Sequence, residues 1–96
     1  NLEGLIERWS SRIYFVHFRN ISGCRDDFVE TFPDDGDVDL LSVLRKLNEV
    51  GYTGCIRPDH APKLSGEYVE IEGYGFQGHI FTASYLRGLL AAVGTE

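Results

Sequence analysis

Hydrophobic positions along the chain follow helical and strand spacings in alternation. Near the start, apolar residues recur three and four positions apart, which predicts a helix over residues 2–9. These residues are Leu2, Leu5, Ile6 and Trp9. Residues 12–20 are rich in aromatic and β-branched side chains, and both faces of this segment are apolar at its start. Such a pattern is typical of a strand in a parallel sheet covered by helices.

A second helix, a second strand and a third helix follow. Asp39 is suited to cap the N-terminus of a helix that Gly51 ends. Its apolar side consists of Leu40, Leu41, Val43, Leu44, Leu47 and Val50. Residues 54–60 are predicted as a short strand that ends near Pro58, because proline cannot donate a ladder hydrogen bond. The last helix ends at Gly94 and carries Ile80, Phe81, Tyr85, Leu86, Leu89, Leu90 and Val93.

The connections between these elements differ in length. Those from helix to strand are short, whereas residues 21–38 and 61–78 form strand-to-helix connections that we interpret as loops. Each has about 18 residues where roughly 2–6 are usual. Long loops at the carboxyl ends of parallel strands are where α/β enzymes place their functional groups.

The order of elements predicts an α/β fold with parallel strands. Two strands cannot form a free-standing parallel sheet, and a (β/α)8 barrel needs about 250 residues. The chain has 96 residues and opens without Met. We therefore expect the C-terminal segment of a TIM barrel with its last two strand–helix units, residues 1–96 being the C-terminal fragment of a single catalytic domain.

Charge is concentrated in one acidic segment. Residues 26–39 carry a charge of −7. The net charge of the whole chain is −6, so the remaining residues sum to about +1. This segment is either a solvated loop or a cation-binding loop, and it disfavours nucleic acid as a partner. No apolar run reaches the roughly 18 residues of a membrane helix, and no signal peptide is visible. Cys24 and Cys55 lack metal or redox spacing, so we expect free thiols in a reducing cytoplasm.

The first strand ends in polar residues that continue an apolar row. His17 and Arg19 follow Ile13 and Phe15 at alternate positions, as reactive groups do at the top of a barrel lumen. A hydrogen-bonded core histidine is the alternative for His17. Both interpretations stay open on the pattern alone.

The second strand and the second loop add further candidates. The strand ends in Arg57-Pro58-Asp59-His60, where Asp59 can ligate a hard cation and His60 can transfer protons. Alternatively, Asp59 caps a turn and pairs with Arg57. Tyr74 lies between two glycines, which suits either a mobile acid or base, or a flexible turn.

Five segments together resemble the mannonate dehydratase family of xylose-isomerase-like barrels. They are His-Phe-Arg-Asn at 17–20, Asp-Asp-Gly-Asp-Val-Asp-Leu at 34–40, Arg-Pro-Asp-His at 57–60, Gly-Tyr-Gly at 73–75 and Tyr-Leu-Arg-Gly-Leu-Leu at 85–90. The resemblance implies an enzyme of hexuronate catabolism that dehydrates D-mannonate to 2-keto-3-deoxy-D-gluconate. It also implies a divalent metal, most simply Mn²⁺, with Fe²⁺, Co²⁺ or Mg²⁺ as alternatives.

The resemblance also implies roles for single residues. His17 and Asp59 match metal ligands, and His60 and Tyr74 match the two catalytic acid/base residues. Arg19 and Arg57 lie in the matching motifs, and we expect them to bind the substrate carboxylate or to organise the ligands. The family's other ligands, a histidine and a cysteine, would precede Asn1, and neither Cys24 nor Cys55 matches that cysteine.

Three hypotheses follow for the function. The first is the dehydratase, a homo-oligomer in which the remainder of the barrel completes the site and this segment alone is inactive. The second is a related metal-dependent sugar isomerase or epimerase. The third is a small non-catalytic α/β module.

Overall fold

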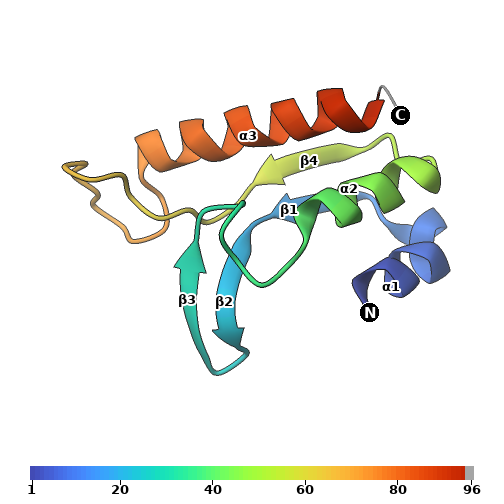
Figure 1. Ribbon diagram of the computed structural model, residues 1–96, viewed down its shortest axis with the longest axis horizontal. Coiled ribbons are helices and arrows are strands. Elements are labelled where there is room, and N and C mark those ends of the chain that lie inside the picture. The colour runs from blue at the N-terminus through green and yellow to red at the C-terminus, as the bar shows by residue number, and fades with distance from the viewer. Residues whose placement is uncertain (95–96) are drawn as a thin grey trace.

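Two parallel strands form the middle of the molecule, as the computed structural model of residues 1–94 shows (Figure 1). Strand β1 (Phe15–Phe18) pairs with β4 (Cys55–Pro58), so that His17 lies opposite Arg57. Helix α2 (Leu40–Glu49) belongs to the crossover between them, which parallel strands require. The predicted parallel α/β pairing is confirmed.

The first two helices begin and end where the sequence indicates, whereas the last begins at Phe76, inside the connection predicted as a loop through residue 78. Helix α1 (Leu2–Trp9) runs into a short 3₁₀ turn, η1 (Ser10–Arg12). The carboxylate of Asp39 accepts a hydrogen bond from the Ser42 amide and caps α2, and Gly51 follows that helix with a φ of +80°. Helix α3 (Phe76–Gly94) lies along β4 in Figure 1.

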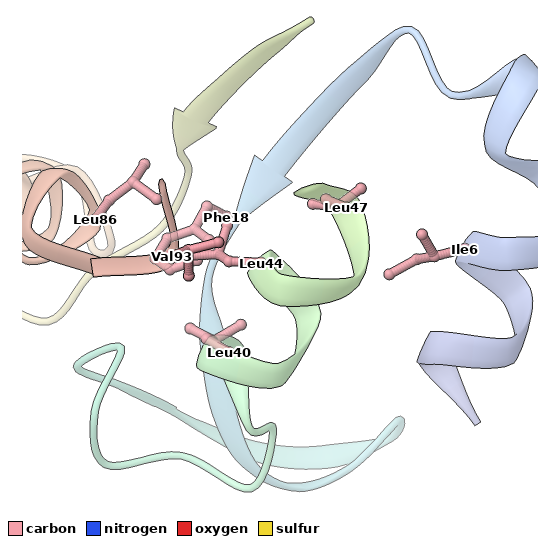
Figure 2. Close-up of a cluster of buried hydrophobic side chains, with 7 residues drawn as sticks. All are labelled: Ile6, Phe18, Leu40, Leu44, Leu47, Leu86 and Val93. Carbon is pink, nitrogen blue, oxygen red and sulfur yellow. The ribbon is translucent and has the colours of Figure 1, made fainter. Parts of the chain in front are cut away.

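Helices α2 and α3 pack on one face of the parallel pair. Figure 2 shows the cluster to which Phe18 of β1, Leu44 of α2 and Val93 of α3 belong. The buried cluster consists of Ile6, Phe18, Leu40, Leu44, Leu47, Leu86 and Val93. Burying each such side chain stabilises the fold by roughly 1.5–3 kcal/mol. This packing fixes the strand ends relative to the helices.

The opposite face of the parallel pair is uncovered. Phe15 and His17 of β1 and Cys55 and Arg57 of β4 are exposed there, whereas their neighbours along each strand are at least half-buried. Both cysteines are free, as expected. Within residues 1–94, no helix combines the length and apolar character needed to cross a membrane.

The prediction of a loop over residues 21–38 is wrong for its first part. Strand β2 (Asn20–Cys24) pairs antiparallel with β3 (Asp27–Thr31) across a turn of Arg25 and Asp26. The hairpin extends away from the parallel pair (Figure 1). Main-chain ladder bonds form it despite its acidic side chains, because Asp26 and Asp27 are exposed to solvent and Glu30 is paired with Arg19.

Asn20 attaches the base of this hairpin to the segment before α2. Its side chain is 2% exposed. Its amide nitrogen donates to the carbonyl oxygens of Pro33 (3.0 Å) and Val38 (2.8 Å), and its Oδ1 accepts from the amides of Ile21 and Val38 (3.0 Å each). Every hydrogen-bonding group of this buried amide is therefore used, which holds β2 in one position.

Candidate active site

The predicted site residues gather where β1 and β4 end. The Asp59 amide donates to the carbonyl oxygen of Phe18 at 2.9 Å and continues the pairing one residue past β4. That bond places the Asp59 carboxylate near His17, and the distance from His17 Nδ1 to Asp59 Oδ1 is 3.5 Å. The two predicted metal ligands are thus neighbours across the parallel pair.

The two predicted catalytic residues contact each other directly. His60 Nε2 lies 2.8 Å from the Tyr74 hydroxyl, and the ring centroids are 4.8 Å apart. The second loop folds back on the strand end to allow this, since the Ala61 amide donates to the Gly73 carbonyl at 3.1 Å. Tyr74 is half-exposed, yet it has a defined hydrogen-bond partner and is not the free phenol of a flexible turn.

Gly73 lets the loop pass close to the His60 ring. Its φ is +87°, a conformation that glycine adopts without strain. A Cβ at this position would come within 3.3 Å of His60 Nδ1. Glycine therefore suits this position because of its positive φ, and a Cβ here would crowd the His60 ring.

The two arginines occupy different environments. Arg19 makes a bidentate ion pair with Glu30, with Nε to Oε1 at 2.9 Å and Nη2 to Oε2 at 2.6 Å. Arg57 is exposed on the uncovered face of the parallel pair beside His17. Of the two, Arg57 is the better placed to meet an anion, and Arg19 is held by the hairpin.

Two residues near the site were not predicted from the sequence. Glu30 of β3 brings Oε2 to 3.9 Å from His60 Nδ1. The two ring nitrogens of His79 in α3 face the carbonyl oxygens of Gly75, at 2.9 Å, and of Asp59, and its ring is stacked with that of Tyr74 at a centroid distance of 6.1 Å. Glu30 is one of many carboxylates in its segment, and only the hairpin singles it out. For His79, the signal available in the sequence was its position near the start of a helix, soon after the Gly-Tyr-Gly segment.

Glu67 ties the second loop to the start of α3. Its carboxylate accepts from the amides of Leu64 (3.0 Å) and Gln77 (2.6 Å). Partial desolvation acts to raise the pKa of Glu67, but backbone hydrogen bonds from Gln77, Leu64 and Gly78 outweigh it and lower the pKa. The ionised carboxylate thus stabilises the loop that presents Tyr74.

The donor atoms present fit part of a metal site. His17 Nδ1 and Asp59 Oδ1 are 3.5 Å apart, which is close enough for both to bind one cation, because metal bonds to such atoms are about 2.0–2.2 Å long. Within residues 1–94, no group of three or more His, Cys, Asp or Glu side chains could hold a metal ion. In the described part of the chain, His17 and Asp59 thus offer two donor atoms and not a complete set of ligands.

Comparison with known proteins gives a consistent result. The family model for D-mannonate dehydratase (UxuA) matches residues 1–96. The mannonate dehydratase of Oceanobacillus iheyensis is 37% identical over all of this chain and 28% of the relative. That of Streptococcus uberis is 40% identical over 86% of this chain and 24% of the relative. The chain thus spans about a quarter of the length of these relatives.

A solved structure agrees with the fold. The crystal structure of mannonate dehydratase from Streptococcus suis serotype 2 matches with a TM-score of 0.82 and 32% identity. The match covers 96% of this chain and 26% of that one. Because the family model matches the whole chain, the hypothesis of a small, unrelated α/β module is rejected. The chain belongs to the D-mannonate dehydratase family.

Proposed function

We propose that the protein of which this chain is a part dehydrates D-mannonate to 2-keto-3-deoxy-D-gluconate. The observation that carries the proposal is the direct contact between His60 and Tyr74 beside the His17–Asp59 pair. Dehydration needs two proton transfers, and this chain places two titratable groups within hydrogen-bonding distance of each other. The names of the relatives indicate the substrate.

The reaction makes definite demands on the site. A proton leaves the carbon next to the carboxylate, and the C–O bond on the neighbouring carbon breaks. The departing hydroxyl takes up a proton and leaves as water, and the resulting enol converts to the 2-keto acid. His60 and Tyr74 are suited to exchange these protons because their hydrogen bond lets one group respond to the charge of the other.

His17 and Asp59 would hold the divalent ion, for which Mn²⁺ is our first choice. When bound, such an ion stabilises the negative charge that develops on the substrate carboxylate. Nitrogen and oxygen donors are typical of sites for Mn²⁺, Fe²⁺, Co²⁺ or Mg²⁺, whereas a thiolate-rich site would indicate zinc. Arg57, exposed beside His17, would bind the carboxylate of the sugar acid.

We further propose that β1, α2, β4 and α3 are two units of a (β/α)8 barrel. The parallel pairing, the helices on one face and the uncovered opposite face support this arrangement. The remainder of the barrel would then supply further strands and the missing metal ligands. Two exposed free thiols fit a cytoplasmic location, and a homo-oligomer is expected for the full-length enzyme.

Product identification with the full-length protein tests the function. D-mannonate and Mn²⁺ should give a 2-keto-3-deoxy acid, and His60→Asn or Tyr74→Phe should slow its formation by about 10²–10⁴-fold. Tyr68→Phe is the matched control, since Tyr68 lies exposed in the same loop. Conversion of D-mannonate to an isomer or epimer without loss of water would overturn the proposal in favour of a related sugar isomerase.

A further inference from the structure

Glu30 approaches the side of His60 that faces away from Tyr74. The imidazole has two nitrogens, and Nε2 is engaged with the Tyr74 hydroxyl at 2.8 Å. The other nitrogen, Nδ1, lies 3.9 Å from Glu30 Oε2. His60 is therefore flanked by a phenol on one side and a carboxylate on the other.

The carboxylate of Glu30 is held in one orientation. Arg19 binds both of its oxygens, and the Glu30 and Arg19 side chains are 20% and 32% exposed. Asn20 anchors the base of the hairpin that carries Glu30 through four hydrogen bonds of its buried side chain. The carboxylate facing Nδ1 is thus held by Arg19 and Asn20, two consecutive residues where the hairpin begins.

Glu30 and His60 line a common hollow. A hollow of about 600 Å³ lies between the hairpin and the second loop, and Glu30, His60 and Gly73 are among its lining residues. Because Gly73 has no Cβ, nothing from that residue blocks Nδ1. The carboxylate acts across this gap by its charge or through one bridging water, since 3.9 Å exceeds a direct hydrogen bond.

We propose that Glu30 is a positioning residue that selects the tautomer of His60. A negative charge beside Nδ1 favours the proton on that nitrogen, which leaves the lone pair of Nε2 to accept the Tyr74 O–H. Asp59 Oδ1 also lies 3.9 Å from Nε2, but the Tyr74 hydroxyl is closer, at 2.8 Å, and occupies the hydrogen bond of that nitrogen. The role of Glu30 in turnover rests on the proposed function, whereas its control of the tautomer does not.

The tautomer can be measured without turnover. The probe is the ¹⁵N spectrum of histidine-labelled full-length protein with Mg²⁺ in place of Mn²⁺, and His60→Asn assigns the His60 signals. We expect a protonated Nδ1 and an unprotonated Nε2 in the parent protein. Glu30→Gln should shift the population toward the Nε2–H form. A parent protein already in the Nε2–H form, or no change in Glu30→Gln, overturns the proposal.

Kinetics test the consequence for catalysis. Glu30→Gln should lower kcat for D-mannonate by about 10–100-fold with little change in KM, as loss of an oriented partner does. Glu30→Asp should restore part of kcat, and it serves as the test variant if the glutamine variant does not fold. Glu72→Gln is the control, because Glu72 is an exposed carboxylate lining the same hollow.

The two failures are distinguishable. If the parent protein forms no 2-keto-3-deoxy acid, the proposed function fails, and the ¹⁵N spectra still decide the role of Glu30. If the parent protein is active but Glu30→Gln keeps full kcat, the positioning role of Glu30 in the reaction is wrong.

Discussion

His60 Nε2 lies 2.8 Å from the hydroxyl of Tyr74, although His60 lies two residues past the end of β4 and Tyr74 lies on the second loop. An isolated parallel β-bridge between Ala61 and Tyr74 brings the loop back to the end of β4. Contact of two acid/base groups makes their contributions to catalysis interdependent. The predictions below concern the full-length protein and start from this pair.

His60 and Tyr74 should act as one unit in the proposed dehydration. His60→Asn and Tyr74→Phe are each expected to lower kcat by about 10²–10⁴-fold, the usual contribution of acid–base catalysis. The double variant should be about as impaired as the worse single variant, because a broken pair has little left to lose. The measurement is steady-state kcat, with metal content checked in every variant. Losses that multiply would show that the residues act independently.

His17 and Asp59 should determine metal binding. His17→Ala and Asp59→Asn are each expected to weaken Mn²⁺ affinity by more than about 10-fold, since even outer partners of metal ligands contribute that much. Direct titration and elemental analysis measure the affinity and the content. Cys24→Ser is the control, because Cys24 is exposed at the tip of the hairpin. Unchanged Mn²⁺ affinity in both ligand variants would remove these residues from the metal site.

Gly73→Ala should lower kcat in addition to destabilising the fold. Gly73 and Gly66 have φ values of +87° and +82°, so alanine at either position should cost about 1–2 kcal/mol in stability. Only at Gly73 would the new Cβ contact His60, whereas the Cβ at Gly66 meets nothing within 4 Å. Thermal unfolding should therefore change alike in both variants, and kcat should fall only in Gly73→Ala. Equal kcat in the two variants would contradict the contact with His60.

The loop that presents Tyr74 should loosen in acid because of Glu67. The pKa of Glu67 is lowered in the folded protein, so its stabilising effect is complete above the ordinary value of 4.5. That effect is lost as the pH falls below 4.5 through the lowered pKa. Hydrogen exchange at the Gln77 amide, followed against pH, should report the loss. Glu67→Gln should remove this pH dependence, and Glu70→Gln, an exposed change in the same loop, should preserve it.

Asn20→Ala should destabilise the hairpin base. The substitution removes the hydrogen-bond partner of the Val38 carbonyl and of the Ile21 and Val38 amides, all of which bond the buried Asn20 side chain. Such a loss costs about 1–3 kcal/mol. Denaturant unfolding measures it, and Asn48→Ala on the exposed side of α2 is the control. Because Asn20 holds the hairpin that carries Glu30, kcat should also fall, and an unaltered stability would contradict the anchoring role.

Elements that depend on local pattern could be predicted from the sequence. Helix α2 has its cap at Asp39, its apolar residues on one side and its terminating glycine at Gly51, all within one segment. The parallel pair was predictable because both strands are bounded by helical segments. The hairpin was not, since the Arg25–Asp26 turn lacks the glycine or asparagine that marks such turns, and the acidic residues resemble a solvated loop.

The sequence by itself determined the order of the helices and of the two parallel strands, the helix caps and the motifs at the strand ends, because these follow from spacings of two to four residues. Only the tertiary structure decided which side chains meet. Glu30 was one carboxylate among several until β3 paired with β2 and brought it to Arg19 and His60. The path of a loop between two anchored ends depends on contacts far apart in the chain, and those contacts leave no periodic signal in the sequence.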